Sequence, residues 1–245
     1  MPLAPAGSFG RMHETQPERF ERIGLPGEFV LVALGMETPT PDHRKAQRHL
    51  TRRDPVLKRL VAAVGPCTLR FEDNRLWALA RSIISQQIST KAALAIRTRL
   101  EAALGRRGKS AAAILSLSDA AMRSAGLSSS KQKSLRDLAR HVHEGIVRLN
   151  AIHELDDEEV IDALLPIRGI GRWTAQMFLI FSLGRFDVLP VDDLGLRAGV
   201  KDHYGMAELP DKARLTEMAE PWRPYRTIAT WYFWRSRGFV PQSGQ

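Results

Sequence analysis

The fold of this chain is decided by residues 165–175, which read Leu165-Pro166-Ile167-Arg168-Gly169-Ile170-Gly171-Arg172-Trp173-Thr174-Ala175. Before this stretch, residues 157–165 place acids in a first turn and apolar side chains at helical spacing, which predicts a helix. After it, residues 174–183 are strongly apolar and predict a second helix. The Gly-x-Gly between them favours a tight turn, because glycine tolerates positive φ and lets another backbone come close.

Such a turn leaves free N–H groups at the N-terminus of the second helix, where an anion can bind. The chain has a net charge of +9 and a pI of about 10.2, so the obvious anion is a nucleic-acid phosphate. Taken alone, however, Gly-x-Gly more often marks only a turn between helices. Two basic runs add weak support for a polyanionic partner, although such runs usually form solvated faces. They comprise Arg44, Lys45, Arg48, Arg52, Arg53, Lys58 and Arg59, and then Arg97, Arg99, Arg106, Arg107 and Lys109.

A longer pattern is more specific than the turn. An apolar helix connects it to Leu189-Pro190-Val191-Asp192-Asp193-Leu194-Gly195-Leu196-Arg197. Together these motifs resemble the helix–hairpin–helix DNA glycosylase superfamily, and within it the 3-methyladenine DNA glycosylase II branch. The resemblance runs from about His43 to the C-terminus and is strongest at residues 83–89, 165–175, 189–197 and 222–235. It implies an all-α, two-lobed fold with the active site in the cleft between the lobes.

The chain divides near residue 40. Residues 1–40 are a proline-containing leader with little periodicity, expected to be partly disordered, although residues 28–36 could pair as a strand. Residues 41–245 are expected to form the glycosylase domain. One lobe is predicted mainly from residues 91–200, which contain the hairpin, and the other from residues 41–90 plus 201–245. Helices are predicted at residues 55–64, 76–85, 89–104, 111–115, 118–125 and 131–149, and a remnant strand at 67–71.

A carboxylate is the expected catalytic group. Cleavage of an N-glycosidic bond builds positive charge on the sugar, which a nearby carboxylate can stabilise; alternatively the carboxylate can activate a water. Asp192 and Asp193 precede a predicted helix, where an Asp is usually only an N-cap. The resemblance divides the pair, because the spacing from Trp173 matches the family's second Asp. Asp193 is therefore the expected catalyst and Asp192 the expected cap.

Trp173 separates two reaction types. Superfamily members that also cut the DNA strand carry a lysine at this position, and its amine forms a Schiff base with the sugar. The indole of Trp173 is not a nucleophile, and Lys201 lies beyond the motif. The resemblance thus implies a monofunctional reaction, in which water attacks and an abasic site remains.

Aromatic residues gather near the C-terminus, at Trp222, Tyr225, Trp231, Tyr232, Phe233 and Trp234. Such a cluster is more often core than binding surface, and Trp222, Tyr225 and Phe233 fit a core. The resemblance places Trp234 opposite Trp173 in a base pocket. Two indoles suit cationic alkylated purines through stacking and cation–π attraction. Met177 completes the expected pocket where relatives often carry tyrosine, which leaves the range of lesions open.

The expected contacts to duplex DNA come from two places. In the family, the residue that matches Gln87 fills the gap left by a flipped nucleotide, and Gln86 lies beside it. Glutamines between two helices are otherwise ordinary loop or cap residues. At the hairpin, the expected contacts are Gly169, Gly171, Arg172 and Thr174.

No cofactor is expected to be required. The resemblance implies a structural Na⁺ or K⁺ at the hairpin, held by the backbone carbonyls of Leu165, Ile167 and Ile170. Cys67 is the single cysteine, so this chain alone offers neither an intrachain disulfide nor a four-cysteine iron–sulfur cluster. The sequence has no apolar run of membrane-spanning length and no secretory signal, so a cytoplasmic, intracellular location is expected.

The resulting hypothesis is a monofunctional glycosylase of base excision repair, expected to be a monomer. It would excise alkylated purines of the 3-methyladenine type from double-stranded DNA. Two alternatives remain from the sequence. A non-catalytic helix–hairpin–helix module would need the hairpin but not Asp193, Trp234 or the two glutamines. A glycosylase for other bases would usually keep the hairpin lysine or the cluster cysteines, both of which this chain lacks.

Overall fold

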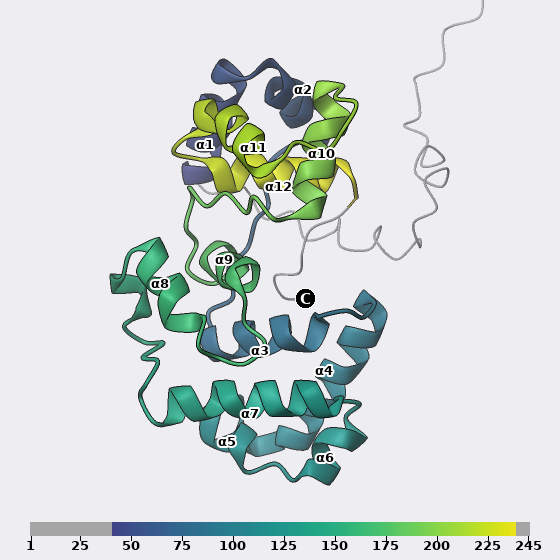
Figure 1. Ribbon diagram of the computed structural model, residues 1–245, viewed down its shortest axis with the longest axis vertical. Coiled ribbons are helices and arrows are strands. Elements are labelled where there is room, and N and C mark those ends of the chain that lie inside the picture. Colours follow the sequence, from purple (N-terminus) through teal and green to yellow (C-terminus); the bar gives the residue numbers. More distant parts are fainter. Residues whose placement is uncertain (1–40, 239–245) are drawn as a thin grey trace, which may run out of the picture. The chain divides into compact units, whose positions relative to one another are not determined.

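A computed structural model describes residues 41–238, which fold into twelve α-helices without a β-strand (Figure 1). This agrees with the predicted all-α class. The helices are α1 (Pro41–Arg53), α2 (Pro55–Val64), α3 (Arg75–Ser85), α4 (Thr90–Leu104), α5 (Ala111–Leu115), α6 (Asp119–Ser124), α7 (Ser129–His143), α8 (Asp157–Leu164), α9 (Arg172–Phe181), α10 (Leu194–Tyr204), α11 (Lys212–Met218) and α12 (Arg226–Ser236). Within the described residues, no helix is long and apolar enough to cross a membrane.

Short polar side chains define where most of these helices begin. In each case an oxygen of Ser, Asp or Asn accepts a bond from a backbone N–H in the first turn, which is worth about 1 kcal/mol. The capping residues are Asp54, Asn74, Ser89, Ser110, Ser118, Ser128, Asp156, Asp193 and Asp211. At α8 the cap is reciprocal, because the Glu159 side chain also accepts from the Asp156 N–H.

The helices pack as two groups (Figure 1). In the central group, α3 packs on α4, α7 and α9, and α7 also packs on α5 and α6. In the terminal group, α12 packs on α1, α2 and α10, while the short turn at residues 220–222 joins α1 to α11. One backbone hydrogen bond between distant segments, from Glu72 N–H to the Phe181 carbonyl (2.7 Å), ties the segment before α3 to the end of α9.

These groups correct the predicted lobe boundaries. Residues 75–85 were expected with the N-terminal helices, yet α3 packs in the central group; residues 194–200 were expected in the central lobe, yet α10 packs on α12. Helix α3 packs in the central group because its surface is almost continuously apolar, and α4, α7 and α9 cover it on several sides. Its buried residues include Leu76, Trp77, Leu79, Ala80, Ile83 and Ile84.

A buried carboxylate holds the terminal group together. Asp54 caps α2 by accepting from the Val56 and Leu57 N–H groups with Oδ1 (2.8 and 3.1 Å). Its Oδ2 accepts from the Trp222 indole (2.8 Å) and from the Tyr204 hydroxyl of α10. Burial raises the pKa of the Tyr204 hydroxyl most, and its hydrogen bond to Asp54 raises this pKa further. The hydroxyl therefore stays protonated and remains a donor. Trp222 and Phe233 are fully buried, so the prediction that they belong to the core is confirmed.

Two local predictions differ from the structure. Residues 131–149 were predicted as one helix, but α7 ends at His143, and Gly145 adopts φ +74° just beyond it. Residues 67–71 were predicted as a remnant strand, but they form no strand in the structure. Burial raises the pKa of Cys67 in this segment to about 12, so its thiol stays protonated. The possible strand at residues 28–36 lies outside the described residues.

Candidate active site

The hairpin, residues 165–171, joins α8 to α9 as predicted. Ile167 and Ile170 point into the core, with exposed fractions of 1% and 5%, and the Ile170 N–H donates to the Ile167 carbonyl (3.0 Å). The N-cap of α9 is Gly171, which has no side chain to satisfy the N–H groups of the first helical turn. Those groups remain open to an external anion.

The two hairpin glycines differ in whether the fold requires them. Gly169 has φ +83°, and a Cβ there would lie 2.7 Å from the Ser134 Oγ on α7. Gly171 has an ordinary φ of −103°, and a Cβ there would meet nothing within 4 Å. Gly169 is thus needed by the fold itself, whereas nothing within the described chain requires a glycine at position 171.

Two further residues expected to contact DNA lie in the first turn of α9. Arg172 is about half exposed and pairs with Glu158 of α8 (2.5 Å), and this hydrogen bond raises the pKa of Arg172. The side chain of Thr174 is buried, so its backbone N–H, rather than its hydroxyl, faces the open helix end. The sequence places Glu158 among the acids before the hairpin but does not indicate its pairing with Arg172, because that pairing depends on how α8 and α9 meet.

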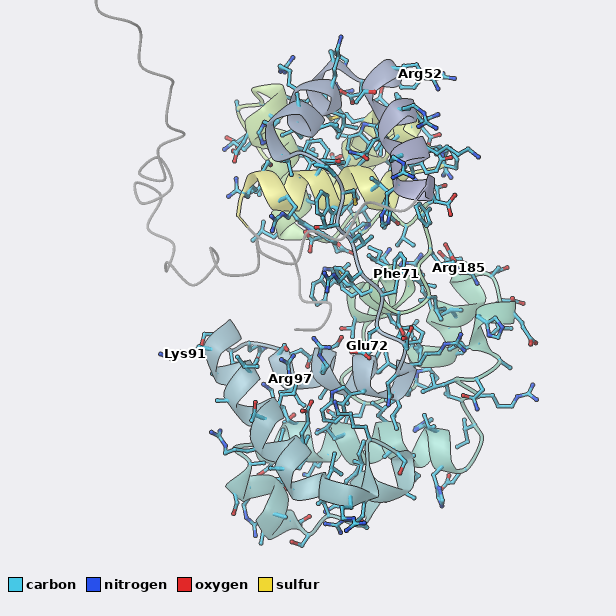
Figure 2. All side chains as sticks on the ribbon, turned by 180° about the vertical axis from the view of Figure 1, so that it is seen from behind. Arg52, Phe71, Glu72, Lys91, Arg97 and Arg185 are labelled. Atoms are coloured by element: carbon cyan, nitrogen blue, oxygen red, sulfur yellow. The ribbon has the colours of Figure 1, made fainter. Side chains whose placement is uncertain are left out.

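The insertion turn, residues 86–89, connects α3 to α4. Gln87 at its tip adopts φ +58° and is, within residues 41–238, the one non-glycine residue with positive φ. Gln86 donates its Nε2–H to the Gly169 carbonyl (2.8 Å), so the turn lies against the hairpin. Figure 2 shows Lys91 pointing away from the body of the protein just after this turn. The structure therefore brings together the two elements expected to contact DNA.

Asp193 lies at the N-terminus of α10 with both carboxylate oxygens occupied. Oδ1 accepts from the Leu196 N–H (2.6 Å) and the Trp234 indole (2.8 Å). Oδ2 accepts from the Trp173 indole (2.8 Å), and the residue is only 5% exposed. One carboxylate thus connects α9, α10 and α12, and no lysine is among these donors.

The division of the aspartate pair needs one correction. Asp193, not Asp192, caps α10. Asp192 is exposed and forms a surface salt bridge with Lys212 of α11 (2.6 Å). The expectation treated capping and catalysis as separate tasks, but one carboxylate has enough lone pairs to cap a helix and to accept from two indoles.

The three expected pocket residues differ in exposure. Trp173 is 36% exposed, whereas Trp234 is fully buried and Met177 is 4% exposed. Trp234 stacks on Phe181 of α9, with ring centroids 5.8 Å apart and planes 21° from parallel. Trp173 is therefore the indole that a ligand can reach directly here. Two residues beside the site were not predicted from the sequence. They are Phe181, and Leu194, which directly follows Asp193 and is 64% exposed. An apolar residue at the start of α10 was the signal that could have indicated Leu194.

A separate charged cavity lies on α3 and α4. Its walls include Glu72 and Arg97, both labelled in Figure 2, and Arg81, which pairs with Glu72 (2.8 Å). None of the predicted site residues lines this cavity, so it is not the site around Asp193. Within the described part of the chain, no group of three or more His, Cys, Asp and Glu could hold a metal ion.

Comparison with known proteins agrees with this arrangement. Residues 80–224 match the family described as HhH-GPD superfamily base excision DNA repair protein. The chain is 36% identical to DNA-3-methyladenine glycosylase 1 of Schizosaccharomyces pombe over 202 residues, which cover 78% of this chain and 86% of that one.

Two solved structures have the same fold. A DNA-3-methyladenine glycosidase from Bacillus halodurans matches with a TM-score of 0.72 and 36% identity, over 81% of this chain and 90% of that one. The Schizosaccharomyces pombe 3-methyladenine DNA glycosylase Mag1, solved in complex with abasic DNA, matches with a TM-score of 0.71 and 34% identity, over 82% of this chain and 100% of that one. With the hairpin, the insertion turn and Asp193 in place, this chain belongs to the HhH-GPD superfamily of base excision DNA repair proteins.

Proposed function

We propose that this protein is a monofunctional DNA glycosylase that flips alkylated purines of the 3-methyladenine type out of duplex DNA and hydrolyses their N-glycosidic bond. The product is an abasic site for base excision repair. The observation that carries this proposal is Asp193, a nearly buried carboxylate held by two indoles beside an exposed aromatic face. The relatives named above, each a 3-methyladenine glycosylase or glycosidase by name, support the same substrate class.

Binding and base flipping are assigned to the two elements around the hairpin. The open N–H groups of α9 would bind a backbone phosphate, which positions the duplex without reading its sequence. Gln87 would fill the gap in the base stack after the damaged nucleotide rotates out. The flipped base would then lie against Trp173, whose exposed indole attracts a cationic purine by stacking and cation–π interaction.

Asp193 is assigned an electrostatic role in bond cleavage. As the C1′–N bond breaks, its electrons neutralise the positive charge of the alkylated purine, and positive charge develops on the sugar. The carboxylate stabilises that charge. Because both its oxygens already accept hydrogen bonds, Asp193 is better suited to supply charge than to remove a proton from water. Water then forms the new bond to C1′ and releases its proton to solvent.

We extend the proposal to a Na⁺ or K⁺ ion at the hairpin. Its donors would be the backbone carbonyls of Leu165, Ile167 and Ile170, and carbonyl oxygens are suitable ligands for such hard ions. The Ile167 carbonyl accepts one hydrogen bond and keeps a second lone pair, so this donor set fits a cation. The ion would add positive charge beside a phosphate. Replacing Na⁺ and K⁺ by tetramethylammonium should weaken duplex binding, and unchanged affinity would exclude the ion.

The central experiment is incubation of the purified protein with methylated duplex DNA, followed by chromatographic identification of the released bases. Release of alkylated purines, in a buffer that contains Na⁺ or K⁺ but no other metal, is the expected result. Duplex binding without release would instead identify a non-catalytic module, and release of other bases would identify another specificity. We also propose that the protein acts as an intracellular monomer; light scattering with and without duplex, and cell fractionation, test these two points.

A further inference from the structure

The insertion turn is attached to the hairpin by a side chain that is itself part of the turn. Gln86 donates its Nε2–H to the Gly169 carbonyl at 2.8 Å, across 83 residues of sequence. That carbonyl belongs to the glycine whose positive φ shapes the hairpin. The conformation of the hairpin and the position of the turn are therefore joined at one peptide group.

Helix α7 supports both elements from behind. Lys131 Nζ donates to the Ile84 carbonyl in the last turn of α3 (2.5 Å), just before the insertion turn. Two turns further along α7, Asp137 Oδ2 accepts from the Arg168 N–H of the hairpin (2.8 Å). Between them lies Ser134, the residue against which Gly169 packs. The turn and the hairpin are thus fixed to the same face of one helix.

The backbone of the insertion turn that α7 supports is strained at Gln87. Gln87 holds a left-handed conformation that is unfavourable for a non-glycine residue, and such strain persists only where the surroundings maintain it. The Lys131 ammonium lies at the C-terminal end of α3, where a cation is favoured by the helix dipole. Burial lowers the pKa of Lys131, which agrees with a side chain withdrawn from solvent to serve this carbonyl.

Resting on the proposed function, we propose that Gln86 and Lys131 are positioning residues for base flipping: they lock the insertion turn to the hairpin so that Gln87 is presented to the duplex in its strained conformation. Neither side chain needs to touch the base or the sugar. Phosphate binding by the hairpin would then bring Gln87 to a fixed place in the base stack. The two hydrogen bonds that form this lock are already present in the protein without DNA.

The first test uses the free protein. Backbone NMR relaxation should show lower order parameters at residues 87–89 in Gln86→Met and in Lys131→Met than in the wild type. Methionine keeps the length of either side chain but cannot donate a hydrogen bond. Lys133→Met is the matched control, because Lys133 is exposed on the same helix and its loss removes the same charge. Lys131→Arg, which keeps a cationic donor, should restore the order.

The second test measures flipping and binding separately. Single-turnover base release from a duplex should fall about tenfold in Gln86→Met and in Lys131→Met, the scale of one lost hydrogen bond. The double variant should lose less than the product of the two effects, because both remove one lock. In Lys131→Met, which changes a residue with no expected DNA contact, affinity for an undamaged duplex should stay within about twofold of the wild type, with an unchanged salt dependence.

Three results would overturn the proposal. Unchanged order parameters at residues 87–89 in both variants would mean that the two hydrogen bonds do not hold the insertion turn. A loss of release in Gln86→Met without any in Lys131→Met would mean that Gln86 acts on DNA directly. A weaker, less salt-dependent affinity of Lys131→Met for undamaged duplex would make Lys131 a phosphate contact. The relaxation measurement needs no catalysis, so it tests the lock even if the wild type releases no base and the proposed function fails.

Discussion

At the scale of single residues, the site depends on how two indoles hold one carboxylate. Trp234 is fully buried and donates to Asp193 Oδ1, whereas Trp173 is partly exposed and donates to Oδ2. The two tryptophans therefore differ in what they do for Asp193. Trp234 orients the carboxylate from the core, and Trp173 combines that task with an open aromatic face.

Trp234→Phe should lower single-turnover base release about 10- to 100-fold, the worth of a hydrogen bond to a charged group. The phenyl ring keeps the stacking on Phe181 but cannot donate to Asp193. Trp231→Phe is the matched control, since Trp231 is a buried indole on the same helix that is not a donor to Asp193. Equal losses in both variants would reduce the effect to general packing in α12.

Asp193→Asn should reduce base release by about 100-fold or more, because the amide keeps the shape of the side chain but removes the charge that stabilises the sugar. Duplex binding should change little, since Asp193 is 5% exposed. Asp192→Asn removes an equal charge one residue away and should retain activity. The assignment is wrong if activity is lost in Asp192→Asn and kept in Asp193→Asn.

At the scale of elements, the hairpin separates folding from binding. Gly169→Ala should lower the free energy of unfolding by about 1–3 kcal/mol, because alanine is strained at φ +83° and its Cβ meets Ser134. Gly171→Ala should leave stability within about 0.5 kcal/mol yet weaken duplex binding, because a Cβ would stand where a phosphate approaches. Denaturant unfolding and duplex titration measure the two effects. Full affinity in Gly171→Ala would argue against phosphate binding at this helix end.

Acid should weaken the attachment of the hairpin to α7. Burial alone would raise the pKa of Asp137, but the hydrogen bonds from the Arg168 N–H and Arg140 outweigh it and hold this pKa below the usual value. A depressed pKa contributes stability that is present above the unfolded-state value of about 3.9 and is lost as the pH falls through the folded-state value. The difference in Tm between the wild type and Asp137→Asn should therefore be largest near pH 7 and shrink below about pH 4. A difference that does not depend on pH would exclude this contribution.

Elements with a clear local pattern were predictable. Helices α2 and α5 match the predicted residues 55–64 and 111–115, because their boundaries carry a capping residue or a glycine that acts locally. The predicted lobes were less accurate. Whether α3 packs with the N-terminal helices or with α7 depends on contacts between residues far apart in the sequence. The local spacing of apolar residues does not predict such contacts.

At the scale of the whole molecule, the expected reaction type depends on whether the amine of any lysine can reach the sugar of the damaged nucleotide. No lysine donates to Asp193 in the described chain, and Lys201 lies two turns along α10 from it. Borohydride should therefore trap no covalent adduct between the protein and a duplex with one alkylated purine, because no amine attacks the sugar. Product strands should break only after alkali or heat. Scission without alkali, abolished by replacing Lys201 or another lysine, would contradict a monofunctional reaction.

The sequence indicated most of the candidate site but not how its residues are connected. Gly169, Trp173 and Asp193 stand in motifs whose spacing marks them individually. The contacts that hold the hairpin and Asp193 come from other helices: Ser134 packs against Gly169, Asp137 accepts from the neighbouring Arg168 N–H, and Trp234 donates to Asp193. The capping role given to Asp192 was wrong for the same reason, because the fold and not the local pattern decides which of two adjacent carboxylates faces a helix end.

Asp54 provides an internal reference for Asp193, the proposed catalytic carboxylate. Like Asp193, it begins a helix, is about 95% buried and accepts an indole N–H. Its remaining side-chain donor is Tyr204, whereas that of Asp193 is the partly exposed Trp173. Both of these donors are partly exposed, but Tyr204 belongs to the same group of helices as Asp54, whereas Trp173 extends from α9 of the central group. Under the proposed function, the structural carboxylate and the catalytic one therefore differ mainly in a single donor, which is a hydroxyl at Asp54 and an indole with an exposed face at Asp193.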